Sequence, residues 1–183
     1  LAVCKQRSWA LNTYMQGKSP IQQLILKKVA EILRMPAEEF ISAHDDCGVP
    51  TYLMQLGQMA SLYARLASGK SLDMERIVRA MTHYPEMVAG KGEFDTELMR
   101  LTQGELISKS GSEGVQCIGI LGEGMGLAIK VIDGATRAKY AIAIYLLQQL
   151  GWITPSIAEV LGEKFITFGQ YKRLEVIGEL SVL

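Results

Sequence analysis

The chain has 183 residues, 49% of them hydrophobic, and its 19 basic residues balance its 19 acidic ones. A balanced charge without a basic cluster argues against a nucleic-acid partner. The longest strongly apolar run, residues 140–147, falls far below the roughly 20 residues that span a bilayer, so no membrane partner is expected.

The first half of the sequence predicts helices. Ser19 is a candidate N-cap, Pro20 suits the first helical position, and Gln22 would complete a capping box. Apolar residues at three- and four-residue spacing then predict a helix that ends at Met35-Pro36. Three further helices are expected, over residues 53–67, from a Ser71 N-cap to a break at residues 83–85, and over residues 94–101.

The second half predicts a sheet, because the apolar period changes at Glu105. Residues 104–120 predict two extended runs joined by a Ser/Gly turn, and residues 125–131 predict a third strand. The remaining expected elements are an apolar helix over residues 135–150 ended by Gly151, a short helix over 156–161 and a last strand over 173–180. Helices followed by an antiparallel sheet with a covering helix indicate an α+β fold.

Lys109 lies in the first of these strands and is followed by Ser110 and Gly111. On the residues alone, it reads as a polar strand residue that faces solvent. The alternative is catalytic, because Lys-Ser/Thr-Gly on a strand edge is found beside the nucleophilic serine of penicillin-recognising enzymes. There the lysine activates the serine, since a partly buried lysine changes charge readily. Lys109 is therefore the candidate catalytic base.

The segment HDDCGVPT, residues 44–51, is expected to be a loop with an imidazole, two carboxylates and the thiol of Cys47. Zinc normally takes three or four ligands, and the sequence adds only His83 and two distant cysteines. A metal half-site and a turn with an incidental thiol are about equally supported by these residues. Cysteines so few and scattered do not indicate a disulfide framework, which favours a reducing cytoplasm, and two of the three are expected to be buried.

Several blocks of the chain, in order, resemble the asparaginase II family, the bacterial rhizobial-type L-asparaginases. The blocks are YMQGKSPIQ (residues 14–22), DDCGVPT (45–51), PEMVAGKGEFDT (85–96), residues 104–115 and KVIDGATRA (130–138). The resemblance runs over nearly all 183 residues. The sequence departs from the family at Ser19, where the family has histidine, and at Asp46, where it has glycine.

The resemblance implies an amidohydrolase that converts L-asparagine to L-aspartate and ammonia by a serine/lysine mechanism. The implied fold is similar to that of serine β-lactamases and glutaminases, and the implied full-length assembly is a homodimer. In such an enzyme Lys109 would activate a serine. Asp45 would lie beside the metal and the substrate, and Cys47 would be a ligand of a zinc ion that helps to position the substrate.

The resemblance also implies that residues 1–183 are the C-terminal part of a single domain whose N-terminal half is absent. That half would hold the Ser-x-x-Lys nucleophile segment, a second serine and an Asn-Cys-Ser-Gly-Lys-His motif with the other zinc ligands. The fold and the zinc site are therefore expected to be incomplete, and the isolated chain inactive. One alternative is a non-catalytic remnant that binds a small amino acid or a partner subunit. A peptidoglycan-type acyltransferase or β-lactamase rests on Lys-Ser-Gly alone and ranks last.

Overall fold

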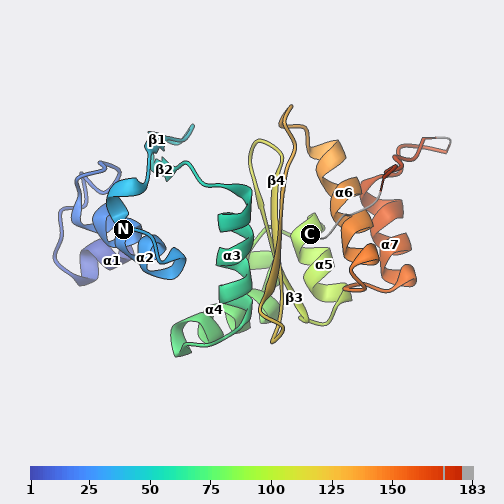
Figure 1. Cartoon of the computed structure of the whole chain (residues 1–183), viewed down its shortest axis with the longest axis horizontal. Coiled ribbons are helices and arrows are strands. Elements are labelled where there is room, and N and C mark those ends of the chain that lie inside the picture. Colours follow the sequence, from blue (N-terminus) through green and yellow to red (C-terminus); the bar gives the residue numbers. More distant parts are fainter. Residues whose placement is uncertain (171, 179–183) are drawn as a thin grey trace. The chain divides into compact units, whose positions relative to one another are not determined.

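The computed structural model describes residues 1–170 and 172–178, and the chain divides into two compact units, residues 1–58 and 59–183 (Figure 1). The earlier elements are α1 (Ala2–Gln6), α2 (Pro20–Leu33), the 3₁₀ turn η1 (Ala37–Glu39), β1 (Ser42–His44) and β2 (Pro50–Tyr52). The later elements are α3 (Leu56–Ala67), α4 (Leu72–His83), the 3₁₀ turn η2 (Pro85–Met87), α5 (Phe94–Leu101), β3 (Leu106–Gly111), β4 (Val115–Ile120), β5 (Met125–Lys130), α6 (Thr136–Gln149) and α7 (Pro155–Phe165). The predicted α+β class is confirmed.

Helix α2 begins as the sequence predicts, but its capping box is only half formed. The Ser19 hydroxyl accepts a hydrogen bond from the Gln22 backbone N–H at 3.5 Å, which confirms the N-cap. The Gln22 side chain does not return to Ser19. It donates instead to the carbonyl of Tyr14 at 3.0 Å, because the Ser19 N–H already donates to the carbonyl of Gln16. The reciprocal half of the predicted box is therefore wrong.

Residues 44–51 are the tip of a small antiparallel hairpin, and the prediction of a plain loop is wrong at both ends. His44 pairs with Pro50, and Ser42 pairs with Tyr52, two strand positions further along. The helix that follows, α3, begins at Leu56 and not at Leu53, because the Leu53 N–H is still bonded to the Ile41 carbonyl beside the hairpin.

The second unit is built on the antiparallel sheet β3-β4-β5. Leu106 pairs with Ile120 and Gly111 with Val115, so the Ser/Gly turn falls where the sequence predicts it. Strand β5 confirms the third predicted strand to within one residue. Because β4 is central, β3 is an edge strand, and no strand in the described residues pairs with its outer side.

Helices cover both faces of this sheet, with α3 and α4 on one face and α5, α6 and α7 on the other (Figure 1). Helix α3 lies unusually close to the sheet, and glycines make this approach possible. A side-chain carbon added at Gly119 would stand 2.7 Å from the Tyr63 carbonyl, and one added at Gly126 would collide with the backbone of Ala60. The other face holds the main apolar core, which includes Phe94, Leu98, Leu106, Ile118, Ile144 and Leu147.

The last part of the chain follows the predictions until the end of α7. Helix α6 is covered along most of its circumference, and Gly151 ends it with a left-handed φ of 70°, as predicted. Helix α7 is longer than predicted, with Thr154 as its N-cap. The predicted strand 173–180 is wrong over 173–178, where only an isolated bridge between Arg173 and Thr167 forms, and its last two positions lie outside the described residues.

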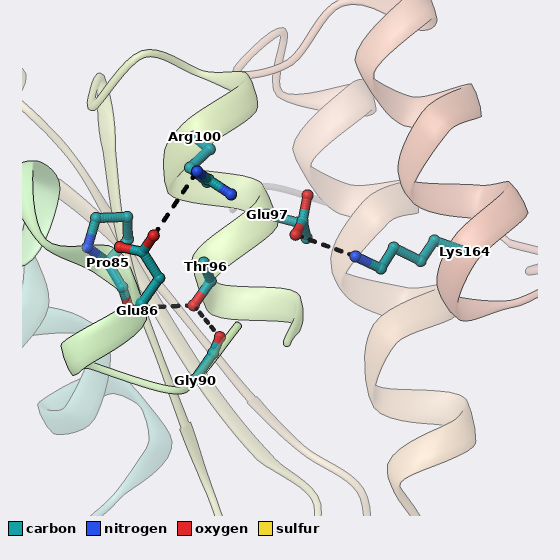
Figure 2. A network of polar contacts seen from close by, with 7 residues as sticks. All are labelled: Pro85, Glu86, Gly90, Thr96, Glu97, Arg100 and Lys164. Carbon is teal, nitrogen blue, oxygen red and sulfur yellow. Dashed lines mark hydrogen bonds and ion pairs between the residues drawn. The ribbon is translucent and has the colours of Figure 1, made fainter. Parts of the chain in front are cut away.

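The start of α5 is fixed by polar contacts that Figure 2 shows. The buried Thr96 hydroxyl approaches the carbonyls of Pro85 at 3.0 Å and Gly90 at 2.6 Å. A further ion pair joins Glu97 to Lys164 of α7 at 3.0 Å. No helix in the described part of the chain has the length and apolar character needed to cross a membrane.

Candidate active site

Lys109 lies on the edge strand β3, where the sequence predicts it. Its side chain is exposed, and its Nζ donates a hydrogen bond to the carbonyl of the next residue, Ser110, at 2.6 Å. Directly across the ladder, Lys109 pairs with Cys117 of β4. An amine on an open sheet edge is accessible to a substrate, and no second strand in the described residues covers it.

Behind Lys109, on the opposite face of β3, a buried carboxylate holds the strand. Asp95 lies in the first turn of α5 and is only 1% exposed. Its Oδ1 accepts from the Ser108 hydroxyl at 2.6 Å and from Nε2 of Gln116 at 2.7 Å, and its Oδ2 accepts from the Ser110 N–H at 2.7 Å. Short bonds to an ionised acceptor are the strong class of hydrogen bond.

The partners of Asp95 are also bonded to one another. Gln116 Nε2 donates to the Ser108 hydroxyl at 2.9 Å, and the Ser110 hydroxyl donates to Gln116 Oε1 at 3.0 Å. Within residues 1–170 and 172–178, no buried side-chain nitrogen or oxygen lacks a partner. A buried polar network that is fully satisfied makes its surroundings rigid. We call Asp95, Ser108, Ser110 and Gln116 the Asp95 network.

The face of the sheet that carries Lys109 packs against α3, and two weakly acidic groups lie there, Cys117 of β4 and Tyr63 of α3. Burial raises the pKa of Cys117 to about 11, and the charge of Asp95 adds to that shift. Burial also raises the pKa of Tyr63, with smaller contributions from Cys117 and Asp95. Both groups are therefore neutral at physiological pH.

Lys139, at the start of α6, is a second lysine near the Asp95 network. It is 3% exposed, and its Nζ lies 4.8 Å from the centre of the Tyr140 ring. Burial lowers the pKa of Lys139, whereas the negative charge of Asp95 opposes this shift and the positive charge of Lys109 adds to it. Lys139 thus partly compensates the buried charge of Asp95 at longer range than a salt bridge.

Asp45 and Cys47, the other predicted site residues, lie together in the hairpin tip of the first unit, whereas Lys109 belongs to the second unit. Asp45 Oδ1 accepts from the backbone N–H of Cys47 and of Val49, each at 2.9 Å. The Asp45 side chain therefore orders its own loop. Cys47 is exposed, while Cys4 and Cys117 are buried, as the sequence predicts for two of the three cysteines.

A zinc ion needs more ligands than this loop supplies. In the described part of the chain, no three His, Cys, Asp or Glu side chains lie close enough to hold a metal ion. One oxygen of Asp45 is already occupied by two backbone donors. The described residues therefore do not form a zinc site by themselves.

Sequence reasoning missed Asp95, Gln116 and Lys139. One signal was present, since polar Ser108 and Gln116 interrupt two otherwise apolar strands. Polar residues at buried strand positions require partners, so they indicate a network. Their partner, Asp95, lies 13 and 21 residues before them in the chain, so no local pattern identifies it.

Comparison with known proteins agrees with the resemblance found in the sequence. The family model of L-asparaginase II matches residues 1–182. None of the curated proteins compared with the chain matches it. Because the family match extends over almost the whole chain, this protein belongs to the L-asparaginase II family.

Proposed function

We propose that this chain takes part in the hydrolysis of L-asparagine to L-aspartate and ammonia, with Lys109 as the residue that activates a serine nucleophile. The family supports an amidohydrolase acting on asparagine. The observation that carries the role of Lys109 is its exposed amine on an edge strand whose backbone is fixed from behind. Layers of helix, sheet and helix around a Lys-Ser-Gly strand also support a β-lactamase-like fold.

In the proposed reaction, the serine hydroxyl attacks the amide carbon while the amine form of Lys109 takes the hydroxyl proton. The proton then passes to the leaving nitrogen, ammonia departs, and water hydrolyses the acyl-enzyme to release aspartate. Ser110 is a poor choice for the nucleophile, because its hydroxyl donates to Gln116 and its N–H donates to Asp95. No serine among the 183 residues stands in a Ser-x-x-Lys context.

The test is ammonia and aspartate release from L-asparagine by the intact gene product and its Lys109→Ala variant. We expect kcat to fall about 1,000-fold, which is the usual range for loss of a general base. Lys130→Ala is the matched control, because Lys130 is also an exposed lysine of this sheet, on β5, and donates to the Glu113 carbonyl. Unchanged hydrolysis by Lys109→Ala would remove Lys109 from the mechanism.

For the first unit we propose that Cys47 contributes one thiolate to a zinc site and that Asp45 lies beside the bound substrate. The exposure of the Cys47 thiol supports this role. Zinc content of the purified gene product, measured for wild type and Cys47→Ser, tests it. Equal zinc content would exclude Cys47, and an unchanged KM for L-asparagine in Asp45→Asn would exclude Asp45.

The 183 residues alone are expected not to hydrolyse asparagine, because the Ser-x-x-Lys context is missing from them. The same observation supports a second candidate, a non-catalytic protein that binds a small amino acid. Calorimetric titration of the purified 183-residue chain with L-asparagine distinguishes the two, when it is read together with turnover by the gene product. Binding without turnover in both would favour the second candidate, and turnover by the 183 residues would contradict the expectation.

A further inference from the structure

We propose that Asp95 is the positioning residue of Lys109: its carboxylate fixes β3 on both sides of the lysine and thereby holds the amine in place. This inference deepens the proposed function and rests on the role given there to Lys109. Asp95 does not contact Lys109 or a reacting atom in this arrangement. It acts on the strand that carries the lysine.

The bonds of Asp95 enclose Lys109 in the sequence. One oxygen takes the Ser108 hydroxyl at 2.6 Å, and the other takes the Ser110 N–H at 2.7 Å, so the residues before and after Lys109 are tied to a single carboxylate. Successive strand residues point to opposite faces. Ser108 and Ser110 therefore turn toward Asp95, and Lys109 turns away from it.

The bond to the Ser110 N–H also explains how the edge of β3 stays open. An unpaired N–H on an edge strand normally attracts another strand. Here the donor is satisfied by a side chain from α5, which occupies the place of a ladder partner. The strand is thus kept rigid without a neighbour that would cover the amine, and a catalytic lysine needs both properties.

A purely structural anchor would not need a charge at this position. Burying a carboxylate is costly unless it is fully hydrogen-bonded, and apolar packing of similar volume is often as stable. Burial lowers the pKa of Lys139, which is also nearly buried, and the negative charge of Asp95 opposes this shift. The gain from such a network is a single backbone geometry, and the strand residue between the two anchored positions is Lys109.

The experiment is a double-mutant cycle on asparagine hydrolysis by the intact gene product, with Asp95→Asn, Lys109→Ala and the combination. The asparagine side chain at position 95 keeps the shape of the aspartate. It replaces one oxygen with an N–H₂ group, which cannot accept hydrogen bonds from the donors around it. We expect Asp95→Asn to lower kcat about tenfold or more with little change in KM, from the loss of a charge-assisted hydrogen bond. If Asp95 acts through Lys109, the double variant loses no more than Lys109→Ala alone.

Thr96→Val is the matched control, because Thr96 is the neighbouring buried residue of α5 and its hydroxyl is directed at the carbonyls of Pro85 in η2 and of Gly90 (Figure 2). This variant removes buried hydrogen bonds from the same helix turn without touching β3. It is expected to lower stability but to leave kcat within about twofold of wild type. A loss of kcat equal to that of Asp95→Asn would reduce Asp95 to a general structural role.

Ser108→Ala is the second variant. It leaves the Asp95 carboxylate in place, so it tests the inference even if Asp95→Asn does not fold. It should give a smaller loss of kcat that is again absent in the Lys109→Ala background. If the loss of kcat in Asp95→Asn or Ser108→Ala multiplies with the loss in Lys109→Ala when the two changes are combined, the inference is overturned and the proposed function remains intact. Full activity of Lys109→Ala would overturn both, so the two failures are distinguishable.

Discussion

The hairpin tip that carries Asp45 and the strand that carries Lys109 are held by interactions of different range. Asp45 accepts from N–H groups two and four residues further along, in an exposed loop. Strand β3 is held by Asp95, which lies 13 and 15 residues before its two partners on that strand and is buried in another element. The loop is ordered by its own residues, whereas the geometry of β3 depends on the packing of α5 against the sheet.

The largest expected effect comes from removing the long-range anchor. Asp95→Ala removes the acceptor of three hydrogen bonds, from the Ser108 hydroxyl, the Ser110 N–H and Gln116 Nε2, so we expect a loss of about 4 kcal/mol in the free energy of opening of β3 and β4. Hydrogen exchange at the amides of these strands measures it. Protection like that of wild type would show that β3 does not depend on Asp95.

The opposite face of the sheet provides the next test of long-range dependence. A methyl group at Gly126 collides with the backbone of Ala60 in α3, which cannot move independently of its helix. We expect Gly126→Ala to cost about 3 kcal/mol in urea unfolding. Gly124→Ala in the adjacent turn meets nothing within 4 Å and bears only the strain of a φ of 67°, about 1 kcal/mol. Equal losses would mean that α3 is free to retreat from β5.

The buried thiol of Cys117 gives a smaller, pH-dependent effect. Because its pKa is raised from 9.0 to about 11 in the folded chain, the fold favours the neutral thiol. The stability that this contributes is fully present below the unfolded value and is lost as pH rises through the folded value. Urea midpoints should therefore fall between about pH 9 and about pH 11, and less so in Cys117→Ala. Identical slopes in the two proteins would contradict the assignment to Cys117.

The local anchor should give the smallest effect. Asp45→Ala removes two exposed hydrogen bonds, so we expect about 1 kcal/mol or less, confined to the amides of Cys47 and Val49. Hydrogen exchange on the same sample reports β3 as an internal control. A change in β3 protection would show that the two regions are less independent than their bonding indicates.

Sequence reasoning succeeded at several helix ends and at one hairpin turn, where the determining residues are close in the chain. Ser19 and Ser71 begin helices because their side chains accept a nearby backbone N–H, and Gly151 ends a helix through its own positive φ. These predictions are confirmed. The register of β3 and β4 follows from a turn between them, with Glu113 and Gly114 both at positive φ. Local geometry of this kind is written in a few consecutive residues.

It failed where a distant partner decides. Gln22 bonds to Tyr14 instead of completing its capping box, and residues 173–178 do not form a strand although their pattern alternates. The candidate site divides in the same way. Lys109 was predicted from a tripeptide, but Asp95 was not, because its acceptor role depends on the packing of α5 behind β3.

The measurement that tests the central claim most directly is amine rescue of Lys109→Ala. If the missing group is the amine of Lys109, small alkylamines should diffuse to the exposed edge of β3 and restore asparagine hydrolysis in a saturable way. The same amines should leave Asp95→Asn unrescued, because its lysine is present but displaced. Hydrolysis by Lys109→Ala at the wild-type rate without added amine would contradict the account.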